Sequence, residues 1–127
     1  MSGADRPIES LNVGELIRSI GEKTPTPGGG AVAAMTAALA AALARMVVNF
    51  SVGKKSLAQH AAQHETALRE LEHHAAAALA LADADARAYS NLNALWKLDK
   101  NDPNSGSMTQ HVMASTSREV VRLARNP

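Results

Sequence analysis

Residues 23–55 read KTPTPGGGAVAAMTAALAAALARMVVNFSVGKK, and this stretch decides what kind of fold the chain can form. Two prolines and three glycines fall within residues 25–30, which excludes a regular helix or strand there. From Ala31 to Val52 no residue breaks a helix, and most of these residues are strong helix formers. Gly53 suits the position after a helix C-terminus, and two lysines near the negative end of the dipole follow it. The stretch therefore predicts a turn followed by one long helix.

A helix of about 20 residues is long enough to cross a bilayer, so its composition must separate a membrane span from a buried helix. The segment consists largely of alanine, which gains little from lipid, and it contains Thr36, Arg45 and Asn49. A charged side chain inside the hydrocarbon layer is costly. We therefore expect a buried central helix and no association with a membrane.

The overall composition favours an all-α helical bundle in a single domain over residues 1–127. Hydrophobic residues make up 46% of the chain and aromatic residues only 2%, so the core must consist of alanine, leucine, valine and methionine. Small side chains let helices approach closely. The formal net charge of +1 argues against non-specific nucleic-acid binding, and the absence of cysteine excludes disulfides and thiolate metal sites. The N-terminus has no signal-peptide pattern, so a cytoplasmic protein is expected.

Besides the alanine-rich helix and a long helix after it, two more helices are expected, one near the N-terminus and one near the C-terminus. Residues 1–9 are predicted to be a frayed leader, and a short helix should follow, capped by Ser10 or Asn12 and ended by Gly21. Residues 99–107 are predicted to form a polar loop, and a last helix is expected over about 108–124.

The long helix is predicted from Ser56 to Asp102, where glycine and proline are absent. Its apolar residues recur in steps of three and four, which is typical of a heptad-like seam packed against neighbouring helices. Such a long seam usually needs a partner, so a homodimer or larger homo-oligomer is expected. The seam consists of Leu57, Ala61, Leu68, Leu71, Ala75, Ala78, Ala82, Tyr89, Leu92 and Trp96.

Only His64 and Asp85 place polar side chains on this seam. A carboxylate on a packed face costs several kcal/mol unless it is paired or protonated, and no basic residue lies three or four positions from Asp85. Asp85 is therefore either an acceptor for a structural hydrogen bond from another helix or a carboxylate kept for chemistry. Asp83 points to another face, where Arg87 four residues later is expected to form a surface ion pair with it.

Two other features allow a functional and a structural interpretation. His60 and His64 have the spacing of metal ligands on a helix, but no third ligand completes a motif, so no metal site is expected. The Pro27–Gly30 turn offers backbone N–H groups at a helix N-terminus, where an anion can bind. It matches neither a P-loop nor a dinucleotide-binding motif, and its spacing alone slightly favours glycines that only let helices turn and pack closely.

Three separated motifs, taken together, closely resemble the cyclodeaminase/cyclohydrolase family of folate enzymes. That family includes formiminotetrahydrofolate cyclodeaminase and methenyltetrahydrofolate cyclohydrolase. The resemblance covers about residues 10–127 and implies that further C-terminal helices of the family domain are missing from this chain. The motifs are Pro27-Gly28-Gly29-Gly30 before the alanine-rich helix, Gly53-Lys54-Lys55 after it, and Asp83-Ala84-Asp85-Ala86-Arg87-Ala88-Tyr89 further on.

The resemblance implies an enzyme that acts on a tetrahydrofolate derivative without a metal or redox cofactor. Cyclodeamination closes a formimino group on N5 onto N10 and expels ammonia, whereas the cyclohydrolase adds water to the methenyl bridge. Because no formiminotransferase is fused to this sequence, hydrolysis of 5,10-methenyltetrahydrofolate to 10-formyltetrahydrofolate is the preferred expectation. Formiminotetrahydrofolate cyclodeaminase is the alternative, and a non-catalytic helical dimerisation module is the competing class.

Both reactions pass through a tetrahedral carbon beside a cationic centre, and such chemistry needs a nearby carboxylate. The family motif and the interrupted seam both point to Asp85 as the general acid/base and electrostatic stabiliser. Lys54 and Lys55 are expected either to bind the glutamate carboxylates of the folate or only to complement the helix dipole. The turn of Pro27, Gly28, Gly29 and Gly30 is expected to shape the pocket wall and to offer N–H contacts to the substrate.

Overall fold

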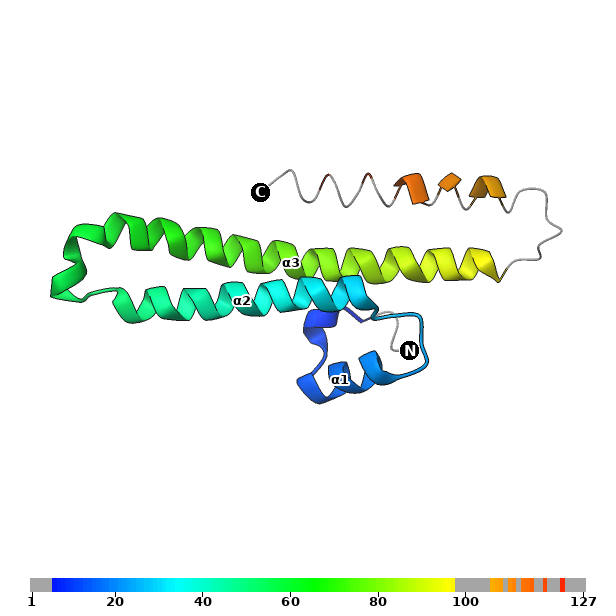
Figure 1. Ribbon diagram of the computed structural model, residues 1–127, viewed down its shortest axis with the longest axis horizontal. Coiled ribbons are helices and arrows are strands. Elements are labelled where there is room, and N and C mark those ends of the chain that lie inside the picture. The colour runs from blue at the N-terminus through cyan, green and yellow to red at the C-terminus, as the bar shows by residue number, and fades with distance from the viewer. Residues whose placement is uncertain are drawn as a thin grey trace.

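The structure is a computed structural model that describes residues 6–97, 106–108, 110, 111, 113–115, 118 and 122. Figure 1 shows two long helices side by side and antiparallel, with a short helix beside the start of the first. The all-α fold predicted from the sequence is confirmed over the described residues. The elements are η2 (Ile8–Ser10), α1 (Val13–Gly21), α2 (Gly29–Ser51), η3 (Lys55–His60) and α3 (Ala61–Trp96), where η denotes a 3-10 helix.

Helix α1 begins where its capping residues predict. The Asn12 side chain accepts a hydrogen bond from the Glu15 backbone N–H at 2.8 Å, and Glu15 Oε2 accepts one from the Asn12 N–H at 3.2 Å. This reciprocal pair satisfies two N–H groups that the first helical turn leaves unpaired. Of the two predicted caps, Asn12 is therefore the correct one, and Ser10 instead ends the preceding turn η2.

The expectation of a frayed leader is wrong for the residues just before α1. Ile8 is only 7% exposed, and its backbone N–H donates a hydrogen bond of 2.9 Å to Asp83 Oδ1 on α3. Ile8 also belongs to the small core cluster, together with Ala31, Met35 and Ala82. A sequence pattern cannot reveal this attachment, because one buried side chain and one long-range hydrogen bond carry it.

The two long helices differ from their predicted bounds in instructive ways. Helix α2 starts at Gly29, so two glycines of the turn already belong to its first turn, and Gly53 follows it with a left-handed φ of 78°. The single long helix predicted from Ser56 is instead divided into η3 and α3. Leu57 therefore lies on η3, outside the seam of α3. The predicted C-terminal loop and helix fall mostly outside the described residues, although Gly106 and Ser107, assigned to the loop, are helical.

Small side chains form the contact between α2 and α3. Ala31 and Ala82 are fully buried there, and Ala38 and Ala78 are buried as well. Because alanine occupies little space, the two helices can lie close together along their length. The predicted core of alanine, leucine, valine and methionine is thus confirmed for alanine and methionine in the described part of the chain, whereas no leucine or valine there is buried.

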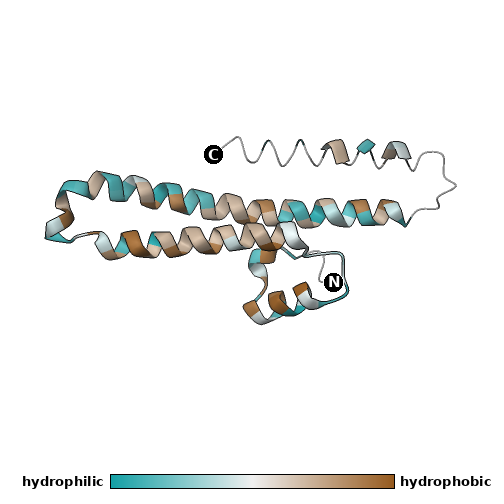
Figure 2. Ribbon diagram, in the orientation of Figure 1, coloured by the Kyte–Doolittle hydropathy of each residue, from teal (hydrophilic) through white to brown (hydrophobic). Residues whose placement is uncertain are grey.

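A neighbouring face of α2, beside the one that packs on α3, remains uncovered among the described residues. Five large apolar side chains are 47–71% exposed on it: Leu39, Leu43, Met46, Val47 and Phe50. Figure 2 shows the apolar character of α2 beside the more polar start of α3. Helix α2 is long and apolar enough to cross a membrane by length and composition, and 17% of its most apolar stretch is buried. The expected burial of α2 is therefore met only where α3 and the N-terminal segment cover it.

Candidate functional site

Asp85 on α3 lies directly against the first turn of α2. A Cβ atom built on Gly30 would be 2.6 Å from Asp85 Cγ and 2.7 Å from Oδ2, well inside van der Waals contact. A Cβ on Gly29 would meet nothing within 4 Å, and one on Gly28 would lie 3.7 Å from the Pro25 carbonyl oxygen. Of the three glycines in the turn, Gly30 is therefore the one whose missing side chain lets the carboxylate reach this position.

The electrostatic setting of Asp85 follows from the same contact. The first N–H groups of an α-helix have no partner within the helix, and the aligned peptide dipoles place partial positive charge at that end. Gly28 caps α2 without a side chain, so no side-chain oxygen of its own occupies this end. Asp85 is half-buried there, and no residue in the described ranges donates a hydrogen bond to its carboxylate. The close packing against Gly30 therefore sets the position of this carboxylate.

Asp83, two residues earlier, has a different role. Its Oδ1 accepts the hydrogen bond from the Ile8 N–H, which ties the N-terminal segment to α3. The predicted surface ion pair between Asp83 and Arg87 is wrong, since Arg87 is exposed and the two residues form no ion pair in the described structure. The acidic motif thus contains one structural carboxylate and one carboxylate without such a partner.

Lys54 and Lys55 lie at the other end of α2 from Asp85. The helix rises by about 32 Å between Gly30 and Ser51, at about 1.5 Å per residue. The two lysines instead line a separate pocket of about 420 Å³ with His64 and neighbouring residues of η3 and α3. Within one chain, the structure therefore unites the glycine turn with Asp85 and leaves the lysines apart, so their role in binding substrate stays a prediction.

The paired histidines lie close together at the start of α3. The ring centroids of His60 and His64 are 6.4 Å apart. His60 Nδ1 lies 2.6 Å from Gln63 Oε1, and its Nε2 lies 3.2 Å from Gln59 Nε2, so both ring nitrogens have neighbouring amide groups. Within the described ranges, no group of three or more histidine, aspartate and glutamate residues is placed to hold a metal ion.

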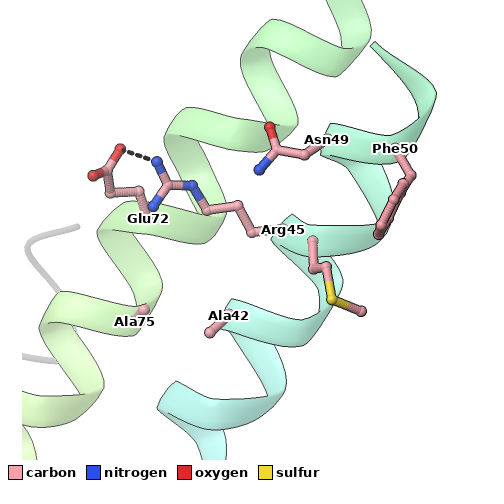
Figure 3. A pocket seen from close by; sticks show the side chains of 7 residues that line it. Ala42, Arg45, Asn49, Phe50, Glu72 and Ala75 are labelled. Carbon is pink, nitrogen blue, oxygen red and sulfur yellow. Dashed lines mark ion pairs between the residues drawn. The ribbon is translucent and has the colours of Figure 1, made fainter.

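A second pocket, of about 510 Å³, lies between the C-terminal half of α2 and the N-terminal half of α3, and the sequence interpretation missed it. Figure 3 shows Arg45 reaching across to Glu72, with 3.3 Å between Nη2 and Oε2, while Asn49 lies one turn away on α2. Arg45 Nε is buried and has no hydrogen-bond partner among the described residues. The only available signal in the sequence was the pair of polar residues four positions apart in an apolar helix. This ion pair joins the two helices about 22 Å along α2 from Gly30.

The fold and the site together define an all-α protein, over the described residues, in which a glycine at a helix N-terminus admits a half-buried carboxylate. The sequence model of the family described as Formiminotransferase-cyclodeaminase matches residues 12–125, which include the glycine turn, both lysines and the acidic motif. The chain belongs to this family, as the resemblance of its three motifs predicts.

Individual relatives agree with the family match. The chain is 38% identical over 106 residues to the formimidoyltransferase-cyclodeaminase of Rattus norvegicus, which covers 80% of this chain and 19% of the relative. It is 34% identical over 99 residues to that of Gallus gallus, which covers 78% of this chain and 18% of the relative. The chain thus spans about a fifth of the length of these curated relatives. No solved structure matches it significantly.

Proposed function

We propose that this chain carries out the cyclodeaminase reaction, in which 5-formiminotetrahydrofolate closes to 5,10-methenyltetrahydrofolate and releases ammonia. The names of the similar proteins include cyclodeaminase, and the family match spans the glycine turn and Asp85. Cyclohydrolase activity was preferred on the sequence because no fused formiminotransferase is present. That argument has no force for a chain that spans a fifth of its relatives, so the cyclodeaminase reaction takes its place.

The chemistry needs one group that moves a proton between two nitrogens. N10 attacks the carbon of the protonated formimino group, and a C–N10 bond forms to give a tetrahedral carbon that carries an amino group. The Asp85 carboxylate accepts the proton from N10 and returns it to this amino group. The C–N bond then breaks, ammonia leaves with the bonding electron pair, and the methenyl cation remains. A carboxylate beside this cationic carbon also stabilises the developing positive charge.

The observation that carries this proposal is the contact between Gly30 and Asp85. A purely structural carboxylate would be expected to accept hydrogen bonds from neighbouring groups, as Asp83 does from Ile8. Asp85 instead lies half-buried against a helix N-terminus without such a donor among the described residues. Packing that fixes a carboxylate while leaving its oxygens available is the arrangement that a general acid/base requires.

The test is an assay with both possible substrates. Purified protein mixed with 5-formiminotetrahydrofolate should release ammonia while the near-ultraviolet absorbance of the methenyl product appears. With 5,10-methenyltetrahydrofolate as substrate, the same absorbance should decay no faster than in the control without enzyme. Faster loss of that absorbance, with no ammonia from the formimino substrate, would support the cyclohydrolase instead. No turnover of either substrate would contradict a folate enzyme.

The same proposal includes the setting in which the enzyme works. We expect it to act in the cytoplasm without a metal or redox cofactor, so its activity should survive treatment with EDTA. We also expect a homodimer or larger homo-oligomer, and the exposed apolar face of α2, from Leu39 to Phe50, supports this. Light scattering during size-exclusion chromatography would test the assembly, and a monomer at micromolar concentration would contradict it.

A further inference from the structure

An exposed pair of aromatic side chains lies on α3 just beyond Asp85. The whole sequence contains only three aromatic residues of the phenylalanine, tyrosine and tryptophan type, namely Phe50, Tyr89 and Trp96. Two of these three are in contact: the ring centroids of Tyr89 and Trp96 are 6.4 Å apart, and their planes form an angle of 88°. This edge-to-face arrangement is one that aromatic pairs prefer. Two of the three aromatic residues of this chain, Tyr89 and Trp96, therefore lie together within about three helical turns of the candidate catalytic residue Asp85.

These rings continue the face of α3 that packs against α2. Ala82, Tyr89 and Trp96 are spaced by seven residues, so they share one side of the helix. Their exposed fractions rise along it from 0% through 44% to 54%, because α2 starts level with Asp85 and covers nothing beyond that point. Figure 1 shows the end of α3 extending past the start of α2. The expectation that Tyr89 and Trp96 belong to a buried seam is thus wrong within the described residues.

The position of Tyr89 relative to Asp85 suits a flat ligand. Residues four apart on a helix are neighbours on its surface, about 6 Å apart along the axis. In a 5-formiminotetrahydrofolate substrate, the reacting carbon is bonded to N5, which is itself an atom of the fused pterin ring. If that carbon lies at Asp85, the ring must lie within about one helical turn of it. Tyr89 is the aromatic side chain at this distance.

We propose that Tyr89, supported edge-on by Trp96, is a stacking platform for the planar pyrimidine ring of the reduced pterin and holds the adjoining N5 beside Asp85. This inference rests on the proposed function, because it takes the substrate to be a folate. Stacking of a flat heterocycle on an aromatic side chain contributes about 1–3 kcal/mol per ring in the comparable case of nucleic-acid bases. A platform of this kind governs how tightly the substrate binds and how it is oriented, while proton transfer stays with Asp85.

The experiment compares Tyr89→Phe with Tyr89→Leu. The probe is 5-formyltetrahydrofolate, whose N5 substituent has an oxygen in place of the imine nitrogen, so no ammonia can leave. By calorimetric titration, Tyr89→Phe should bind it within about twofold of wild type, because the ring remains. Tyr89→Leu should bind about tenfold more weakly, because it keeps an apolar side chain but loses the ring. In the formimino assay, KM should rise by a similar factor for Tyr89→Leu while kcat changes little.

Each contrary result has a distinct meaning. If wild type turns over the formimino substrate and Tyr89→Leu binds the probe as wild type does, the platform is overturned and the proposed function stands. If wild type neither binds nor turns over folate, both are overturned. If Tyr89→Leu changes the subunit number in light scattering but leaves the affinity unchanged, the rings are a subunit contact rather than a ligand site. Should Tyr89→Leu lose its helical circular dichroism, Trp96→Leu takes its place, and wild-type affinity in that variant would equally overturn the platform.

Discussion

The two ends of the α2–α3 hairpin differ in how strongly they constrain their residues. At one end, Gly30 and Asp85 touch so closely that no side chain fits between them, and Ala31 and Ala82 beside them are fully buried. At the other end, Lys54 and Lys55 are exposed, and Phe50 on the last turn of α2 is 69% exposed. Close packing fixes geometry at the first end, whereas little in the described chain does so at the second. Chemistry that needs a positioned carboxylate therefore belongs at the first end.

The largest effect should come from removing the charge of Asp85, at the end of the hairpin where Gly30 and Asp85 are in contact. Asp85→Asn keeps the shape of the side chain but cannot take up a proton, so kcat should fall by about 10²–10⁴-fold. Thermal melting should stay close to wild type, because the two side chains have nearly the same volume. Asp83→Asn is the matched control, since its side-chain oxygen can still accept the Ile8 hydrogen bond. Equal losses of activity in both variants would show that Asp85 has no special role.

Filling the space at Gly30 should move the same carboxylate without removing it. The Cβ of Gly30→Ala would clash with the end of the Asp85 side chain, which can rotate away at small cost in stability. We expect kcat/KM to fall by about 100-fold, as for a misplaced catalytic group, with little change in melting temperature. Gly21→Ala is the control, because a Cβ there meets nothing within 4 Å. Wild-type activity in Gly30→Ala would contradict the requirement for close contact.

The attachment of the N-terminal segment can be tested through stability alone. Asp83→Ala removes the acceptor of the Ile8 N–H, and losing such a partly buried hydrogen bond should cost about 1 kcal/mol of the free energy of unfolding. Urea denaturation would measure this loss, and Asp83→Asn should show little of it. A destabilisation as large in Asp83→Asn as in Asp83→Ala would indicate that the negative charge, rather than the hydrogen bond, matters.

The smallest effect is expected at the other end of the hairpin, where Lys54 and Lys55 lie. If Lys54 and Lys55 bind glutamate carboxylates, replacing both by alanine should raise KM by a few-fold and leave kcat unchanged, because exposed charge pairs contribute about 0–1 kcal/mol. Because the lysines lie a helix length from Asp85, this increase should be larger for a polyglutamylated substrate than for the monoglutamate, which serves as the internal control. Equal KM values for wild type and the double variant with both substrates would remove the lysines from the site.

Much of the structure around Gly30 and Asp85 could be predicted, because the sequence patterns that indicate it extend over only a few residues. Asn12 followed by Glu15 is a capping pattern, and the run from Ala31 to Val52 contains no helix breaker, so both helices were placed within two residues. Asp85 stood out because it interrupts an apolar period. The split between η3 and α3 was missed, since residues 56–60 have helical composition, and composition alone does not distinguish a 3-10 helix from an α-helix.

Local patterns were sufficient for the helical class, the alanine-rich core, the glycine turn and the suspicion attached to Asp85, because propensity, capping and periodicity operate within a few residues. Other properties depended on contacts between distant segments. The pairing of Asp83 with Ile8 bridges 75 residues, and the need for glycine at position 30 arises from a carboxylate 55 residues later. The exposure of Tyr89 and Trp96 likewise follows from where α2 starts in space. Such features depend on the relative placement of whole helices, and a periodic pattern shows which face of a helix is apolar but not what covers it.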